Sequence, residues 1–309
     1  MINGELDFST STFEFFADAK ASQSEVLFVG DPVDPRGKEA IAALGAISNR
    51  KIKLGYEADK NRILMDDVAQ DFDALVQICN GGGKIRIETT TLGLAEILKT
   101  IQACKHAGVK TIEFVYVEPK EYKLRKPVAV GYFDPRDFEL TKNRIFSAVR
   151  GFSYEHSSEV KEHFVFLLGF ESSRLMQAVS QQDRKLPSKY AVIGVPPFRV
   201  GWETNSLASH AHDLANLNFE SNTISFCAAN SAREAYLTLW SLYKNLGAEH
   251  SILMVSPLGT KPHAVGAALF LVETKGHAFP TALYYDHPIR PRDRTDDLGA
   301  WHFWEARWP

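Results

Sequence analysis

The chain has 309 residues, of which 45% are hydrophobic and 24% charged, and its formal net charge is −3. This length allows one large or two ordinary domains with a substantial core. The small negative charge excludes a global basic field, so nucleic acid is not an expected partner. No uncharged stretch approaches the roughly 20 apolar residues that span a bilayer, and the N-terminus carries acids and no basic leader. We therefore expect a soluble, cytoplasmic protein with no membrane contact.

The first half alternates apolar runs with helical periodicity. Residues 25–46 and 84–109 each read as strand, turn and helix, and 111–119 as a further strand. Residues 51–67 alternate and contain a turn, which predicts a hairpin. The glycines at 81–83 predict the end of the preceding helix.

The second half repeats the same order more cleanly, in residues 162–182, 189–217, 223–247, 251–273 and a last strand at 281–288. Continuous apolar strands alternating with helices favour a parallel sheet covered on both faces. We predict an α/β fold of two Rossmann-like halves with mostly parallel sheets covered by helices. The predicted boundaries are an N-terminal domain at 1–125, a charged connecting region at 126–160 and a C-terminal domain at 161–309.

Ligands of open α/β sheets bind where the strands end, because the following helices present free N–H groups and a positive dipole there. Several of these turns have good capping chemistry. Asp34 and Pro35 fit the N-cap and first positions of a helix. Ser231 with Glu234 fits a capping box, and Thr260 fits an N-cap.

Capping does not explain the cations at these helix starts, which are Arg36, Arg174, Arg233 and Lys261. A cation in the first turn opposes the helix dipole by a few tenths of a kcal/mol up to about 1 kcal/mol. A bound phosphate or carboxylate would reverse that sign. The predicted ligand-binding set is Gly259, Thr260, Lys261, Arg174, Ser172, Asn230, Ser231 and Arg233. The arginines of the charged loop that follows, Arg290, Arg292 and Arg294, are candidates for a lid over the anion.

No cofactor is predicted from sequence motifs. The turn after the strand at 251–257 lacks the spacing of a Walker A sequence, and "GDPVDPRG" is not a G-x-G-x-x-G fingerprint. The three cysteines Cys79, Cys104 and Cys227 form no CxxC pair, which excludes a zinc ribbon or a disulfide scaffold and fits a reducing compartment.

The apolar strand that runs into "LGTKPHAVGA" (258–267) resembles the Gly-Thr-Lys turn of CARF-type Rossmann domains, which sense cyclic oligonucleotides in prokaryotic immunity. The resemblance covers about ten residues. It implies that Gly259, Thr260 and Lys261 touch ligand phosphates and that a dimer shares the pocket.

Few groups of residues in the sequence fit a catalytic site. Asp286 beside His287 at a strand end, or Glu171 after an earlier strand, could supply an acid–base pair. His210 and His212 point about 200° apart on a helix, so they cannot chelate one metal ion, and we expect a solvated helix face there. Cys227 is expected to be a small core residue.

Three functions follow from these features. The first is the binding or sensing of a phosphorylated, nucleotide-like small molecule in a regulatory or defence pathway, with Glu171 or Asp286 accepting from a ribose or base. The second is an enzyme that acts on a nucleotide or sugar phosphate. The third is a structural subunit of a homodimer or larger complex, with the Trp-rich tail at 299–309 as its interface. For the tail itself we favour a packed edge strand and terminus, and an exposed aromatic patch is the alternative. The sequence leaves open whether chemistry follows binding.

Overall fold

The computed structural model describes residues 6–122, 140–141, 146–155, 157, 159–181, 188–247, 250–292 and 295–309. Within these residues the chain forms seven α-helices and two sheets, which confirms the predicted α/β class. The chain divides into two compact units, Met1–Lys123 with Arg290–Pro309, and Leu124–Ile289. Much of the predicted connecting region at 126–160 lies outside the described residues.

The first unit contains the following elements, in chain order: β1 (Asp7–Phe13), η1 (Phe16–Ala19), β2 (Ser24–Val29), α1 (Pro35–Gly45), β3 (Ser48–Glu57), β4 (Arg62–Met65), β5 (Val68–Gln70), α2 (Phe72–Cys79), β6 (Ile85–Glu88), α3 (Leu94–His106), β7 (Thr111–Tyr122) and β13 (Thr295–Arg307). The predicted hairpin is the antiparallel pair β3–β4. Asp34 caps α1 with Pro35 at its first position, and α2 ends just before the three glycines, both as predicted.

The eight strands of the first sheet lie in the order β1-β13-β7-β6-β2-β3-β4-β5. The central strands β7, β6, β2 and β3 run parallel, and the outer strands are antiparallel to their neighbours. The sheet is therefore mixed. One face packs on α1, through a core that includes Leu27, Val115, Phe303 and Leu44.

The C-terminal strand β13 belongs to the first sheet, where it lies between β1 and β7. This differs from the expected domain at 161–309. The physical reason is packing, because Trp301, His302, Phe303 and Trp304 are all buried, so side chains that point to both faces of β13 are covered. Trp304 is only 1% exposed and Trp301 is also buried, so the tail is a packed strand, as we expected in preference to an exposed aromatic patch.

The second unit contains the following elements: β8 (Lys161–Leu168), α4 (Ser172–Ser180), β9 (Ser188–Gly194), α5 (Trp202–Asn216), η3 (Ser221–Thr223), β10 (Ile224–Cys227), α6 (Ala232–Leu246), β11 (Ser251–Pro257), α7 (Lys261–Thr274) and β12 (Thr281–Leu283). The last strand is shorter than the predicted 281–288.

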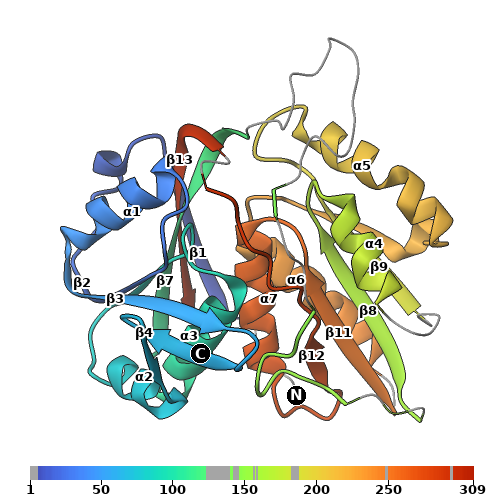
Figure 1. Ribbon diagram of the computed structural model, residues 1–309, viewed down its shortest axis with the longest axis horizontal. Helices are drawn as coiled ribbons and strands as arrows, with labels where there is room; N and C mark the ends of the chain where they lie inside the picture. The colour runs from blue at the N-terminus through green and yellow to red at the C-terminus, as the bar shows by residue number, and fades with distance from the viewer. Residues whose placement is uncertain are drawn as a thin grey trace. The chain divides into compact units, whose positions relative to one another are not determined.

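The second sheet has the order β10-β9-β8-β11-β12, and every strand pair in it is parallel. Figure 1 shows α4 with α5 on one side of this sheet and α6 with α7 on the other. The α4–α5 side packs on an apolar core that includes Phe164, Phe166, Leu175 and Leu214. The chain reverses its direction of winding between β8 and β11, which are neighbours in the sheet although β9 and β10 come between them in sequence.

In the part of the chain that the structure describes, no helix is both long and apolar enough to span a bilayer.

Candidate functional site

The carboxyl edge of the second sheet, where β8, β9, β10 and β11 end, is the candidate site. The helices α4, α5, α6 and α7 each begin at this edge, because each follows one of those strands. The turns after β8 and β11 touch. A Cβ atom on Gly169 would lie 3.0 Å from the Cα of Gly259, and one on Gly259 would lie 2.7 Å from the carbonyl oxygen of Leu168. Both positions therefore need glycine for the close approach of two turns.

Thr260 is the N-cap of α7, as its sequence predicts. Its hydroxyl oxygen accepts from the backbone N–H of His263 at 3.4 Å and donates to the carbonyl of Ala229 at 2.6 Å. The hydroxyl thus ties the start of α7 to the turn after β10, and its proton is already used within the protein. Thr260 positions the edge and is not available as a hydrogen-bond donor to phosphate.

Lys261 is the first residue of α7 and is half-buried. The first turn of α7 contains no acidic side chain. Lys261 therefore places a positive charge at the dipole end of α7, where no acidic side chain of the same turn offsets it.

Arg174 does not belong to the anion-binding set. Its guanidinium donates to both carboxylate oxygens of Asp286 at 2.7 Å and to the carbonyl of Leu258 at 2.6 Å. Burial alone would lower the pKa of Arg174, but the charge of Asp286 outweighs it and raises that pKa. The positive charge of Arg174, which we predicted to bind the ligand, is therefore neutralised by Asp286, which lies 112 residues away along the chain.

The same pairing removes the predicted acid–base couple. Asp286 is completely buried against Arg174, and the Nε2 atom of its neighbour His287 lies 3.2 Å from the carbonyl of Ser147. Burial lowers the pKa of His287. The two side chains therefore serve separate structural contacts.

The carboxylate of Glu171 is also bonded to groups of the protein. One of its carboxylate oxygens accepts from the backbone N–H groups of Leu140 and Thr141 and from the hydroxyl of Thr141, at 2.8 to 3.0 Å. It holds the 140–141 segment against the start of α4, and it makes no side-chain cap of that helix. Ser172, the first residue of α4, is half-buried.

The start of α6 has the predicted N-cap at Ser231 but not the reciprocal bond of a capping box, because the backbone N–H of Ser231 donates to the carbonyl of Ala228. The hydroxyl of Ser231 accepts from the N–H of Glu234 at 3.0 Å, while Glu234 accepts from the backbone N–H of Ala228 at 2.7 Å. Asn230 is half-buried, and Arg233 is exposed in the first turn. Of the predicted cations at this edge, Arg233 is therefore exposed in the first turn of α6, and Lys261 is half-buried at the start of α7.

Two buried histidines, which we did not predict from the sequence, form hydrogen bonds with the turns of this edge. The Nε2 atom of His210 lies 3.0 Å from the carbonyl of Gly169, and that of His263 lies 3.1 Å from the carbonyl of Ala228. A carbonyl only accepts, so each Nε2 carries the proton. Each Nδ1 atom is buried, with no hydrogen-bond partner among the described residues.

The prediction of a solvated face at His210 and His212 is wrong for His210, which is 1% exposed, whereas His212 is exposed. Burial lowers the pKa of both His210 and His263 to about 4, so both rings are neutral near pH 7. A histidine in the first turn of an otherwise apolar helix was the available signal for His263.

Cys227 is buried, as predicted, 3.3 Å from Nε2 of His263. This pair is not an activated nucleophile. Burial raises the pKa of the Cys227 thiol to about 12, and the neutral imidazole beside it supplies no positive charge.

The corresponding edge of the first sheet is filled by the protein itself. The guanidinium of Arg36 is buried and bonds Asp34 at 2.6 Å, the carbonyl of Val117 and the hydroxyl of Thr295. It is therefore a structural group and not a ligand-binding cation. The carboxylate of Glu88 is buried and accepts from the backbone N–H groups of Thr90 and Thr91.

Of the three arginines predicted to form a lid, Arg290 does not cover the candidate site. Arg290 donates to the carbonyls of Thr90 and Thr91 in the first unit, so it closes that turn and not a ligand pocket. Arg292 is exposed, and Arg294 lies outside the described residues.

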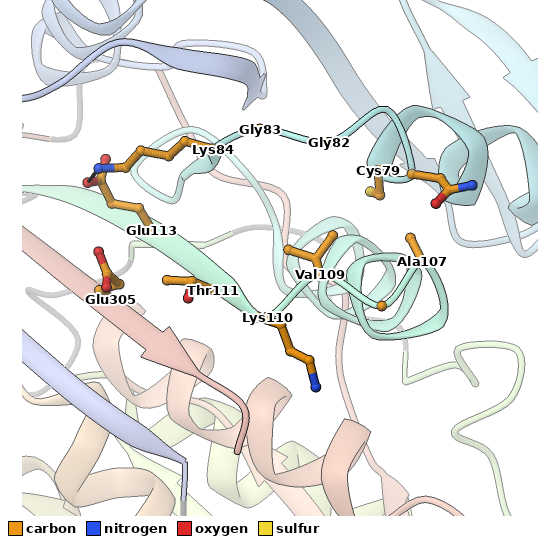
Figure 2. A pocket seen from close by; sticks show the side chains of 12 residues that line it. Cys79, Gly82, Gly83, Lys84, Ala107, Val109, Lys110, Thr111, Glu113 and Glu305 are labelled. Atoms are coloured by element: carbon orange, nitrogen blue, oxygen red, sulfur yellow. Dashed lines mark ion pairs between the residues drawn. The ribbon is translucent and has the colours of Figure 1, made fainter.

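A hollow of about 600 Å³ lies at the opposite, amino edge of the first sheet (Figure 2). Its walls are the ends of α2 and α3 and the starts of β6 and β7, and they carry Cys79, Lys84, Lys110 and Glu113. Lys84 is ion-paired with Glu113, and Lys110 donates to the carbonyl of Pro309 at 3.3 Å. Its cations are therefore largely balanced by protein groups.

Among the described residues, no three His, Cys, Asp or Glu side chains are grouped closely enough to hold a metal ion. No protein-family model matches the chain, and neither a curated protein nor a solved structure does. The function is therefore argued from the geometry of these residues.

Proposed function

We propose that the second unit binds a phosphorylated, nucleotide-like small molecule at the carboxyl edge of its sheet. The observation that carries this proposal is the strand order β10-β9-β8-β11-β12 with all strands parallel. In such sheets the crevice beyond the strand ends, at the point where the winding reverses, is the usual ligand position. Here that point lies between β8 and β11, and we interpret the unit as Rossmann-like on this basis.

Electrostatics supports an anionic ligand there. Lys261 and Arg233 begin α7 and α6, and these two helices direct their positive dipole ends to the same edge of the sheet. A phosphate between them would accept from backbone N–H groups and side-chain cations together. Asn230 and Ser231 supply further polar groups at the start of α6, and Ser172 supplies one at the start of α4 on the same edge of the sheet.

Hydrogen bonds from side chains fix the turns at this edge of the sheet. His210 and His263 bond the turn carbonyls of Gly169 and Ala228, and Thr260 bonds that of Ala229. Rigid turns lower the conformational entropy that a ligand must otherwise remove on binding. Thr260, Gly259, His210 and His263 are thus positioning residues in this proposal.

The resemblance of "LGTKPHAVGA" to CARF-type domains narrows the ligand class to be tested first. It favours cyclic oligonucleotides, a pocket shared by a dimer and a regulatory or defence role. The enzyme alternative has weaker support, because Asp286 and Glu171 are held by protein groups and His287 bonds a carbonyl.

A thermal-unfolding panel tests the proposal, with cyclic oligonucleotides, mononucleotides, sugar phosphates, inorganic phosphate and an unphosphorylated nucleoside as probes. A ligand at 100 times its Kd should stabilise the protein by about 2.7 kcal/mol, which raises the Tm of a unit of this size by about 5 to 10 °C. The nucleoside should give no such shift.

The variants Lys261→Ala and Arg233→Ala should lose most of that shift and keep the Tm of the ligand-free protein. Lys161→Ala is the matched control, because Lys161 is an exposed lysine of the same unit at the start of β8, the opposite edge of the sheet. A shift that survives both edge variants, or that Lys161→Ala abolishes, would contradict the site.

A further inference from the structure

Two cysteines of the first unit lie side by side. Cys79 is the last residue of α2 and Cys104 lies in α3, and their sulfur atoms are 3.6 Å apart. Both thiols are reduced and buried. A disulfide bond is about 2.05 Å long, so the sulfurs need to approach by only about 1.5 Å to form one.

The chain next to Cys79 can accommodate this approach. Helix α2 ends there and is followed by Asn80 and three glycines, of which Gly82 and Gly83 have the left-handed φ values +76° and +86°. A Cβ atom on Gly82 would meet nothing within 4 Å. The backbone at Gly82 thus has free space, whereas a Cβ atom on Gly83 would lie 2.7 Å from that of Glu25, so the adjustment is confined to the end of α2 and the residues up to Gly82.

The two thiols differ in access. Cys79 lines the hollow at the amino edge of the first sheet, and Figure 2 shows it above the turn that carries Ala107 and Val109. Cys104 is not part of that lining and has no exposed surface. A small molecule that enters the hollow therefore meets Cys79 first.

We propose that Cys79 and Cys104 form a reversible redox pair, which a small peroxide entering the hollow converts into a disulfide. The proposal is independent of the ligand site proposed in the second unit. In the first step the Cys79 thiolate attacks a peroxide oxygen, the O–O bond breaks, and water and a sulfenic acid are formed. In the second step the Cys104 sulfur attacks that of Cys79, the S–O bond breaks and a second water leaves. Two thiols lose two electrons and two protons in total, and hydrogen peroxide is reduced to two waters.

Burial assigns the order of the steps and limits their rate. It raises the pKa of the Cys104 thiol, with the neighbouring Cys79 adding to the shift, so Cys104 stays protonated while Cys79 is oxidised. The reaction should accelerate as pH rises, because the thiolate is the attacking form. The resulting bond would join α2 to α3 and fix two walls of the hollow.

The experiment treats the intact folded chain with hydrogen peroxide, then unfolds it in a thiol-alkylating reagent. The three thiols of the reduced protein should fall to one, the mass should decrease by about 2 Da as two hydrogens are lost, and the linked peptides should contain Cys79 and Cys104. Dithiothreitol should restore all three thiols. In Cys104→Ser, a sulfenic-acid trap such as dimedone should label Cys79.

Cys227→Ser is the matched control, because Cys227 is equally buried but has no cysteine beside it. It should form the Cys79–Cys104 bond at the same rate as the unaltered chain. Three thiols persisting in peroxide, a bond that forms only after unfolding, or linkage through Cys227 would each overturn the proposal.

Discussion

Arg174 ties together three separate parts of the carboxyl edge of the second sheet. It leaves the first turn of α4, bonds both oxygens of Asp286 and reaches the carbonyl of Leu258 in the turn after β11. All of these groups are buried, so no water can replace any of them. At the scale of single residues, this ion pair is the contact on which the geometry of the edge depends most.

Removing one member of the pair should therefore be costly. We expect Arg174→Met to lower the free energy of unfolding by about 3 to 5 kcal/mol, because it leaves the Asp286 carboxylate buried without a partner. Adding Asp286→Leu should recover most of this loss, since an apolar pair replaces an ion pair of similar volume. Urea unfolding followed by circular dichroism measures both, with exposed Arg233→Met as the control. A loss below about 1 kcal/mol in Arg174→Met would show that the buried pair does not act in this way.

At the scale of elements, α6 and α7 pack closely at Gly266, where the absence of a side chain lets the two helices approach. A Cβ atom on Gly266 of α7 would lie 2.4 Å from the carbonyl oxygen of Ala232 and 2.9 Å from the Cβ atom of Ala235, both in α6. Helix α7 is buried along almost its whole length, so it cannot rotate to relieve such a clash. These two helices carry Arg233 and Lys261 at their starts, so their packing sets the distance between the two cations.

The contact predicts that Gly266→Ala destabilises the protein although alanine favours helices by about 1 kcal/mol over glycine. We expect a net loss of about 1 to 3 kcal/mol, since overpacking forces the helices apart. Gly45→Ala in α1 is the control, because the nearest atom to its Cβ would be at 3.9 Å. It should leave stability unchanged or slightly increased. Thermal unfolding distinguishes the two, and equal effects would contradict the close packing of α6 and α7.

For the molecule as a whole, the buried histidines link stability to pH. His210 and His263 have a pKa of about 4 in the folded chain, because burial disfavours the charged ring, against 6.5 for the ordinary side chain. Above pH 6.5 neither state binds the proton, so these groups have no effect. As the pH falls from 6.5 to 4 only the unfolded chain is protonated, and the folded chain loses stability.

Each histidine should lower the free energy of unfolding by about 1.4 kcal/mol per pH unit within that window. Urea unfolding at pH 7, 6 and 5 measures this slope. In His210→Gln and in His263→Gln the slope should fall by about that amount, whatever the change in stability at pH 7. Exposed His212→Gln should keep the original slope. Parallel pH profiles for all four proteins would contradict the buried, neutral state of the two rings.

The sequence by itself determined the features that depend on neighbouring residues. The alternation of apolar runs and helical periods predicts the α/β class, and Asp34, Ser231 and Thr260 cap their helices as their positions indicate. Capping involves atoms only three residues apart, so no distant part of the chain has to be known. The helix starts that carry Lys261 and Arg233 were predictable for the same reason.

Only the tertiary structure decided which charges remain available and where the last strand belongs. Arg174 and Asp286 are separated by 112 residues, and β1 pairs with β13 at the other end of the chain. Such contacts depend on how strands are ordered in a sheet, which residue spacing along the chain does not encode. The burial of His210 and of Trp304 has the same origin, because a side chain loses solvent only when distant elements cover it.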